Sequence, residues 1–358
     1  MKRALALAAR AAGRTSPNPM VGAVVVRGGR IVGEGYHQKA GTPHAEVHAM
    51  RRAGDKARGA TLYVTLEPCS HYGRTPPCCE AVIDAGIKRV VAAMVDPNPQ
   101  VAGRGLAALA EAGIAVEAGL MEDAARDLNE VFIKHITTGR PFVVMKSAVS
   151  LDGKTATSSG HSFWVTGEAA REKVHRMRDR YDAVMVGIGT VLVDDPRLTT
   201  RLPDGEAGRD AIRVVVDSRL RLPPESKVIN PDSTAPLLVA TTERSPRERR
   251  DELTGLGAEV LVLPEDDGRV AIGALMDALG QRGITSVLLE GGAALNASAL
   301  EAGVVDKLVV FVAPKLVGGA NAPGMIAGAG RERMDQAWDL RRMSLTRVGE
   351  DYMFTGYL

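Results

Sequence analysis

The sequence predicts two successive α/β domains. In both halves of the chain, short apolar runs typical of strands alternate with stretches that have helical spacing. The polar segment TTGRP at residues 137–141 separates the halves, so we place the boundary there. A chain of 358 residues with 45% hydrophobic and 25% charged residues can form two globular cores. We therefore expect one domain over residues 1–140 and a second over residues 141–358.

The first half has the pattern of a three-layer α/β/α domain. Its opening, MKRALALAARAAG, is predicted to be an amphipathic helix. The runs MVGAVVV and RIVGEGY predict a hairpin around Gly28 and Gly29. Helices and strands are then expected in alternation, at HAEVHAMRRAG, TLYVTL, PPCCEAVIDAG, KRVVAAMV, GRGLAALAEAG, AVEAG and a final helix near 121–137.

The second half predicts a largely parallel sheet with an antiparallel edge. Its strand candidates are rich in Val, Ile and Leu, and most are separated by helices. They are FVVMKSAVS, YDAVMVG, AIRVVVD, PLLVAT, EVLVL, SVLLE and DKLVVFVA. The C-terminal MSLTRVGEDYMFTGYL is expected to form an antiparallel pair, and the polar residues 201–211 a loop.

Composition and charge narrow the class of partner. The formal net charge is +2 and no long basic run occurs, which argues against nucleic acid and acidic membranes as partners. No apolar run approaches the roughly 18 residues that a membrane span needs. The alanine-rich opening is interrupted by Arg10 and is too short for a secretory signal. Three cysteines without such a signal do not suggest a disulfide framework, so we expect a soluble, cytoplasmic protein.

All three cysteines lie in one stretch, LEPCSHYGRTPPCCEA at residues 66–81. Zinc prefers tetrahedral sites with sulfur and nitrogen ligands, and a catalytic zinc keeps one position for water. Cys69 and Cys78 can supply two thiolates, and His44, at the start of a predicted helix, can supply a third ligand. Glu46 completes the His-x-Glu and Pro-Cys pattern of zinc nucleobase deaminases, in which the glutamate transfers protons without binding the metal.

The adjacent cysteines cannot both face one metal ion. Pro76 and Pro77 put Cys78 in the first turn of a helix, where the helix dipole favours a thiolate. The side chain of Cys79 points about 100° further around the helix axis. We favour Cys78, although the spacing alone also permits Cys79 as the ligand.

Two further histidines are candidates for the site. His48 lies four residues after His44 and could form a two-histidine metal face, but Glu46 is misplaced for that motif. His71 could also be a ligand, although we favour a loop position near the substrate. A purely structural zinc site would need a fourth protein ligand, which Cys79 or His71 would have to supply.

A nucleic-acid-editing deaminase would share this zinc motif. Such an enzyme needs a basic groove with interleaved aromatic side chains. Only 4% of the residues are aromatic and the net charge is small, so the sequence disfavours this class.

Seven segments together resemble the bifunctional riboflavin-biosynthesis deaminase/reductase family. They are TSPNPMVGAVVV, HAEVHAM, VTLEPCSHYGRTPPCCEA, DPNPQVAGRG, SLDGKTAT, VGIGTVLVDDPRLTTR and LLEGGAALNASAL. The resemblance covers nearly the whole chain and includes the long spacing between Cys69 and Cys78. It implies a cytidine-deaminase-like domain followed by a dihydrofolate-reductase-like domain, and a homo-oligomer. It also implies His44, Cys69 and Cys78 as zinc ligands, with Glu46 as proton donor.

The same resemblance implies two reactions on small pyrimidine ribotides. The first is zinc-dependent hydrolytic deamination of 2,5-diamino-6-(5-phosphoribosylamino)pyrimidin-4(3H)-one. The second is NADPH-dependent reduction of the ribosyl side chain, which gives 5-amino-6-(5-phosphoribitylamino)uracil. The second half lacks a Gly-x-Gly-x-x-Gly fingerprint after its first strand, but LLEGGAALNAS and VGIGT offer tight strand-to-helix turns that can present backbone amides to a phosphate.

Matched position by position, the resemblance places two sets of contacts in the second half. The NADPH contacts fall on Ala148, Trp164, Thr190, Asp194, Ser218, Gly292, Ala293, Ala294, Leu295, Asn296, Ala297 and Ser298. The substrate contacts fall on Ser162, Arg178, Leu198, Arg201 and Glu290. Arg178 and Arg201 suit the substrate's 5′-phosphate, because guanidinium binds phosphate bidentately. Lys146, Asp194 or Asp195 could assist proton transfer, and the sequence does not choose among them.

Overall fold

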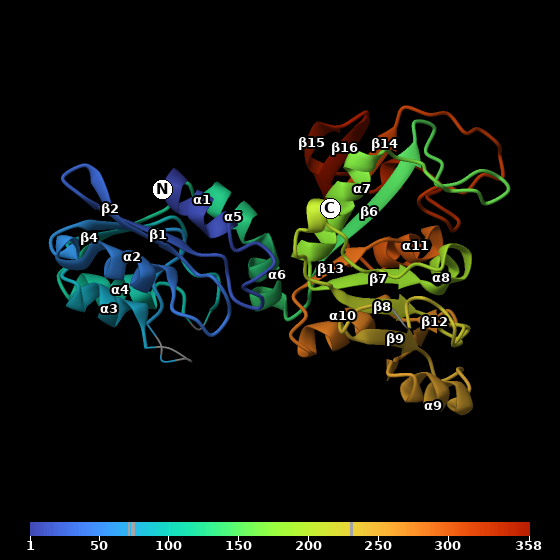
Figure 1. Cartoon of the computed structure of the whole chain (residues 1–358), viewed down its shortest axis with the longest axis horizontal. Coiled ribbons are helices and arrows are strands. Elements are labelled where there is room, and N and C mark those ends of the chain that lie inside the picture. Colours follow the sequence, from blue (N-terminus) through green and yellow to red (C-terminus); the bar gives the residue numbers. More distant parts are fainter. Residues whose placement is uncertain (71, 73–75, 100, 230–231) are drawn as a thin grey trace. The chain divides into compact units, whose positions relative to one another are not determined.

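The chain folds into two units, each built around its own β-sheet (Figure 1). The computed structural model describes residues 1–70, 72, 76–99, 101–229 and 232–358. The units are Met1–Gly139 and Arg140–Leu358, and each has its own hydrophobic core.

The first unit has the α/β arrangement that the sequence predicts. Its described residues form a five-stranded sheet in the order β2-β1-β3-β4-β5, with β1 antiparallel to β2 and β3 and the other neighbours parallel. The strands are β1 (Gly22–Arg27), β2 (Arg30–Tyr36), β3 (Thr61–Val64), β4 (Arg89–Ala92) and β5 (Ala115–Ala118). The helices are α1 (Lys2–Ala9), α2 (Ala45–Ala53), α3 (Cys78–Asp84), α4 (Arg104–Glu111), α5 (Glu122–Leu128) and α6 (Glu130–Thr138), with a 3-10 turn η1 (Gly54–Ala57) after α2.

Helices cover both faces of this sheet (Figure 1). On one face, Ala4 and Leu7 of α1 pack against Val24 of β1. On the other face, Ala49 of α2, Val82 of α3 and further apolar side chains form the larger core. Side chains of a strand alternate between the two faces, so a single apolar strand such as β1 can serve both layers.

Two glycines let α2 approach β2 closely. A Cβ atom added at Gly33 would lie 2.1 Å from the carbonyl oxygen of Ala49, and one at Gly35 would lie 2.4 Å from that of Ala45. No side chain fits at such distances, so only glycine permits this contact. The first turn of α2 is thereby held directly against the sheet.

The predicted helix near 121–137 is instead two helices. α5 ends and α6 begins at Asn129, whose backbone (φ −105°, ψ 21°) is not helical. The Asn129 side chain accepts a hydrogen bond from the Met20 amide at 2.8 Å and donates one to the Met20 carbonyl at 3.0 Å. The prediction of one continuous helix is wrong because this contact joins residues far apart in sequence, which local helical spacing cannot show.

The second unit contains the parallel sheet with an antiparallel edge that the sequence predicts. Within its described residues the order is β10-β9-β8-β7-β13-β6-β14-β16-β15, and only β16 and β15 run antiparallel to their neighbours. These strands are β6 (Phe142–Ser150), β7 (Ala183–Gly187), β8 (Ile212–Val216), β9 (Leu237–Thr241), β10 (Glu259–Val262), β13 (Ser286–Leu289), β14 (Lys307–Ala313), β15 (Arg341–Val348) and β16 (Asp351–Tyr357). The sequence did not predict the small hairpin of β11 (Glu265–Asp266) and β12 (Arg269–Val270).

The helices of this unit cover both faces of its sheet (Figure 1). They are α7 (Glu168–Arg180), α8 (Ile188–Asp194), α9 (Arg247–Gly255), α10 (Ile272–Gln281) and α11 (Ala293–Glu301), with 3-10 turns η2 (Pro203–Gly205) and η3 (Met334–Gln336). Leu275 of α10 and Leu295 of α11 pack on one face, and Leu253 of α9 and Val191 of α8 on the other. Throughout the part of the chain that is described, no helix is long and apolar enough to cross a membrane.

Replacement of Gly35 by alanine should destabilise the first unit. The added methyl group would collide with the Ala45 carbonyl, and such overpacking costs about 2–3 kcal/mol of the free energy of unfolding. Scanning calorimetry should show a lower melting temperature for the first unit. Gly273→Ala in α10 is the matched control, because a Cβ there meets open space, and it should leave both transitions unchanged or slightly higher. Equal melting temperatures for Gly35→Ala and the parent protein would show that α2 does not rest on the strand so closely.

Candidate active sites

Three potential metal ligands meet in the first unit. His44 is the residue before α2, Cys69 follows β3, and Cys78 is the first residue of α3. Their ligand atoms all lie within 4.8 Å of one another, with His44 Nδ1 at 3.1 Å from Cys78 Sγ and 3.6 Å from Cys69 Sγ. Segments that are distant in sequence thus deliver one nitrogen and two sulfur atoms to one point, which is the donor set of a catalytic zinc site.

The two sulfur atoms share their protons unequally. The backbone amide of Cys78 donates to Cys69 Sγ at 3.3 Å. The hydrogen bond from the Cys78 thiol, together with His44, lowers the pKa of Cys69, whereas the same bond and burial raise the pKa of Cys78. One thiolate therefore forms readily, and a soft divalent cation would replace the remaining proton.

Glu46 lies beside this group in the first turn of α2. Its side chain is buried, and its Oε2 atom has no hydrogen-bond partner among the described residues. Burial raises the pKa of Glu46 to about 6. A buried carboxylate oxygen without a hydrogen-bond partner costs free energy. Its position beside the three ligand atoms therefore indicates that Glu46 Oε2 exchanges hydrogen bonds or a proton with a bound ligand.

Cys79 and His48 lie outside the group. Cys79 Sγ points toward the carbonyl oxygens of Pro68 and Gly105, both at 3.4 Å, and belongs to the hydrophobic core. Burial raises the pKa of Cys79 to about 12, so it remains a thiol. His48 is absent from the ligand cluster, and His71 lies outside the described residues.

Glu67 is a site-forming residue that the sequence analysis missed. Its buried carboxylate accepts four backbone N–H bonds at 2.7–3.2 Å, from Asp96, Gly103, Gly105 and Leu106. These bonds fill the carboxylate's acceptor positions and fasten the segment before Cys69 to the start of α4. The only sequence signal for this role was its place in the Glu-Pro-Cys motif.

A cleft of about 1790 Å³ opens in the second unit. It lies where β7, β8 and β13 end, which is the usual position of ligands in parallel sheets. All NADPH and substrate residues expected from the sequence line it, except one. They are Ala148, Ser162, Trp164, Arg178, Thr190, Asp194, Leu198, Arg201, Ser218, Glu290, Gly292, Ala293, Ala294, Leu295, Asn296 and Ser298. The exception is Ala297, whose methyl group faces Gly328.

The two glycine turns of the sequence meet in this cleft. Gly187, at the end of β7, donates its amide to the Gly291 carbonyl at 2.8 Å. Gly292 is the residue before α11, and a Cβ there would lie 3.3 Å from the Thr190 hydroxyl of α8. A tight backbone turn at a helix start is a suitable cradle for a phosphate. Trp164 is 60% exposed and lines the cleft, with the guanidinium carbon of Arg171 at 4.6 Å from its ring centre.

Glu290 is the centre of a buried ion network in the cleft. Arg178 donates two hydrogen bonds to it, at 2.6 and 2.9 Å, and Lys146 Nζ lies 3.3 Å away. Burial opposes ionisation of Glu290, but Arg178 and Lys146 outweigh it and hold the pKa of Glu290 below its usual range. Arg178 also donates to the Thr199 carbonyl, so this guanidinium is mainly engaged by the protein. Arg201 makes only one side-chain hydrogen bond within the described chain, to the Thr199 hydroxyl at 2.9 Å.

The three proton-transfer candidates of the second unit all line the cleft, in different surroundings. Lys146 is paired with Glu290, as described above. Asp195 accepts a bond from the Lys227 amide and pairs with its ammonium group at 3.0 Å. Burial raises the pKa of Asp194, which lies 3.5 Å from the Ser162 hydroxyl.

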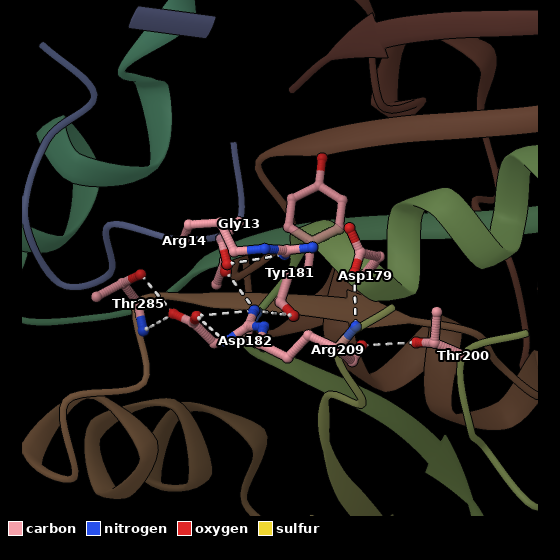
Figure 2. A network of polar contacts seen from close by, with 9 residues as sticks. Gly13, Arg14, Asp179, Tyr181, Asp182, Thr200, Arg209 and Thr285 are labelled. Carbon is pink, nitrogen blue, oxygen red and sulfur yellow. Dashed lines mark hydrogen bonds and ion pairs between the residues drawn. The ribbon is translucent and has the colours of Figure 1, made fainter. Parts of the chain in front are cut away.

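Asp182, another buried carboxylate of the second unit, anchors the segment that carries Arg201 (Figure 2). Thr285 donates to Asp182 through its amide at 3.0 Å and its hydroxyl at 2.6 Å. The guanidinium of Arg209 lies 3.4 Å from the other carboxylate oxygen, and the Thr200 hydroxyl donates to the Arg209 carbonyl at 2.8 Å. The segment around Arg201 is thereby tied to the core of the unit.

Family models match separate parts of the chain. Residues 1–94 match the cytidine and deoxycytidylate deaminase zinc-binding region, and residues 141–354 match the RibD C-terminal domain. The chain is 46% identical to riboflavin biosynthesis protein RibD of Bacillus amyloliquefaciens, over 99% of this chain and 94% of that protein. The chain belongs to the RibD family. RibD of Escherichia coli is also 46% identical, over 98% of this chain and 96% of that protein.

Solved RibD structures share the fold of the whole chain. RibD of Acinetobacter baumannii has a TM-score of 0.89 at 42% identity, covering 99% of this chain and 97% of that one. A deaminase/reductase from Thermotoga maritima has a TM-score of 0.86 at 37% identity, covering 100% of this chain and 97% of that one. The resemblance inferred from the sequence is therefore confirmed, and so are the cytidine-deaminase-like and dihydrofolate-reductase-like folds.

As a RibD protein, the chain is a bifunctional deaminase and reductase of riboflavin biosynthesis. The nucleic-acid-editing and structural-zinc alternatives are thus set aside. Its cofactors are zinc and NADPH. The residues fit both cofactors: the nitrogen and two sulfur atoms beside the unpartnered Glu46 oxygen fit a three-ligand zinc, and the Gly292 turn fits a dinucleotide phosphate.

The adjacent cysteines should differ in their effect on zinc binding. Cys78→Ser removes one of two thiolates and should abolish stoichiometric zinc, whereas Cys79→Ser should leave about one zinc per chain. Zinc content of the purified variants, measured by inductively coupled plasma mass spectrometry, checks this. Equal zinc loss in both variants would mean that the register of α3 is wrong.

Proposed function

We propose that the first unit deaminates 2,5-diamino-6-(5-phosphoribosylamino)pyrimidin-4(3H)-one. We further propose that the second unit reduces the ribosyl group of the product, giving 5-amino-6-(5-phosphoribitylamino)uracil. The cluster of His44, Cys69 and Cys78 beside the unpartnered carboxylate of Glu46 is the observation that carries the deaminase assignment. The Thermotoga maritima relative is named as a diaminohydroxyphosphoribosylaminopyrimidine deaminase and 5-amino-6-(5-phosphoribosylamino)uracil reductase, which supports both assignments.

In the deaminase site, His44, Cys69 and Cys78 hold the metal and Glu46 moves protons. Zinc, when bound, supplies a Lewis acid that lowers the pKa of water. Glu46 accepts a proton from the attacking water and returns it to the pyrimidine, so that ammonia leaves and a carbonyl remains. A carboxyl group with a pKa of about 6 is well matched to taking and returning a proton near neutral pH.

In the reductase site, the cleft binds and orients both reactants. NADPH, when bound, supplies the hydride for the ribosyl carbon. We assign cofactor binding to the cleft-lining residues Ala148, Trp164, Thr190, Asp194 and Ser218 and to the run that begins at Gly292. The run 292–298 contributes mainly its first turn, since Ala297 faces Gly328. We assign substrate binding to Ser162, Arg178, Leu198, Arg201 and Glu290.

We also propose a cytoplasmic homo-oligomer. The outer pair β15–β16 exposes apolar side chains on one face, from Met343, Leu345, Tyr352 and Phe354. An exposed apolar face at a sheet edge favours association with another chain. Three free cysteines, two of them placed as metal ligands, suit a reducing compartment.

Mass spectrometry of the pyrimidine product tests the function, and Glu46→Gln separates its two steps. The parent enzyme should release the deaminated product without NADPH and the ribityl product with it. Glu46→Gln keeps the size and the metal ligands but removes the proton carrier, so deamination should fall by about 10²–10⁴-fold or more. The variant should still oxidise NADPH with chemically supplied deaminated intermediate at nearly the parent rate, because that site lies in another unit with its own core.

Two outcomes would contradict this assignment. Deamination by Glu46→Gln at a tenth of the parent rate or better would mean that Glu46 is not the proton carrier. Loss of reduction in the same variant would mean that the two units do not act independently.

NADPH should be preferred over NADH. Arg219, Arg244 and Arg269 line the cleft near Ser218, to which the Val270 amide and the Thr242 hydroxyl are hydrogen-bonded. Arg244 pairs with Glu265 at the surface, at 2.7 Å, and a 2′-phosphate would compete for its guanidinium; guanidinium groups at this place suit the 2′-phosphate that distinguishes the two cofactors.

Replacement of Arg244 tests this preference. Arg244→Ala should raise KM for NADPH by about ten-fold while leaving KM for NADH unchanged, as measured by steady-state oxidation with the deaminated intermediate. Arg282→Ala, a surface residue outside the cleft, is the control. Comparable kcat/KM for both cofactors in the parent enzyme would refute the preference itself.

A further inference from the structure

Helix α7 presents three basic side chains to the cleft of the second unit, beside Glu168 and Glu172. Arg171, His175 and Arg178 are four and three residues apart, so they share one face of the helix, and all three line the cleft. Arg178 is held by Glu290, and the guanidinium carbon of Arg171 lies 4.6 Å from the ring centre of Trp164. The remaining residue, His175, has no role in the function described above.

The hydrogen bonding of His175 determines where its proton lies. The backbone N–H of Arg201 can only donate, and it lies 3.2 Å from His175 Nδ1, so Nδ1 is the acceptor. A neutral imidazole whose Nδ1 accepts carries its proton on Nε2. Nε2 is not among the buried unpartnered atoms, and none of the described residues accepts a hydrogen bond from it. Because the ring lines the cleft, Nε2–H is a donor available to a ligand there.

The surroundings of His175 keep it neutral. Arg178 of its own helix, Arg201 of the following segment, Lys146 of β6 and Glu290 after β13 face it. Burial, and then the positive charges of Arg178 and Arg201, lower the pKa of His175 to about 4. A second proton, on Nδ1, would also break the bond to the Arg201 amide.

An acceptor-rich group complements this corner of the cleft. Arg201 and Lys146 offer donors alone, and the donor capacity of Arg178 is largely used by Glu290 and Thr199. Arg201 commits one nitrogen to the Thr199 hydroxyl and keeps further donors. A phosphate, with several acceptor oxygens and a negative charge, complements a guanidinium and a neutral N–H donor side by side.

We propose that His175 is a substrate-binding residue of the reductase site, and that its Nε2–H donates to the substrate's 5′-phosphate beside Arg201. This inference rests on the proposed reductase function. It assigns the phosphate to His175 and Arg201, while Arg178 mainly holds Glu290 in place.

The variants His175→Asn and His175→Gln distinguish phosphate binding from support of the Arg201 segment. Asparagine can place an acceptor near the position of Nδ1 but offers no donor at Nε2. Glutamine can place a donor near Nε2 but offers no acceptor at Nδ1. Lys173→Ala, on the exposed side of the same helix, is the matched control, and melting curves check that each variant is folded.

The variants are assayed by NADPH oxidation with 5-amino-6-(5-phosphoribosylamino)uracil and with its dephosphorylated analogue. His175→Asn should raise KM for the phosphorylated substrate by about ten-fold or more, with kcat within about two-fold, because one hydrogen bond to a charged group is lost. KM for the analogue should not change, and His175→Gln should retain most of the parent affinity. Calorimetric titration with ribose 5-phosphate, without NADPH, should show the same loss of affinity for His175→Asn.

The opposite results would overturn the proposal. An unchanged KM and an unchanged affinity for ribose 5-phosphate in His175→Asn would show that His175 does not contact the phosphate. An equal rise of KM for both substrates would show that it only positions the Arg201 segment. Failure of the parent enzyme to oxidise NADPH with either substrate, by contrast, would overturn the reductase function and this proposal with it.

Discussion

The close contact between α2 and β2 is the constraint on which the deaminase site depends. Gly33 and Gly35 allow the helix backbone to touch the strand, and this contact places the first turn of α2. His44 and Glu46 belong to that turn, whereas the two ligand cysteines come from the ends of other elements. Three ligands from three segments can form a tetrahedral site only if the backbones themselves are fixed. Glu67 fixes the backbone before Cys69 in a similar way, because its carboxylate accepts hydrogen bonds from backbone amides of distant segments.

In the reductase unit, the site is held in place by the buried charge of Glu290 and not by close packing of backbones. Glu290 directly follows β13 and pairs with Lys146 of β6 and Arg178 of α7. Because removing one partner would leave a buried charge uncompensated, these side chains have little freedom. The anchored segment beyond α8 then brings Arg201 to the same wall. The substrate end of the cleft is therefore one connected network rather than a set of independent contacts.

Local patterns predicted most of the fold. Every strand longer than two residues, and the antiparallel C-terminal pair, were visible as apolar runs bounded by Gly, Pro or polar residues. The exception among the longer elements was the helix break at Asn129, which follows from a hydrogen bond to Met20. Expected cleft residues proved to lie together, apart from Ala297. The roles of Glu67 and His175 could not be found in this way: the Glu-Pro-Cys motif marks Glu67 without showing its distant amide partners, and a single His in a helix carries no local signal.

The sequence by itself determined the chemistry of this protein: a His-x-Glu and two spaced cysteines specify a metal, and whole-chain similarity specifies the family. The tertiary structure alone decided which neighbouring atoms face the sites. Cys79 turns into the core while Cys78 faces His44, and Arg178 is bound by Glu290 while Arg201 keeps donors for a ligand. The physical reason is that residue types define which bonds are possible, whereas packing and the pairing of buried charges define which of those bonds form.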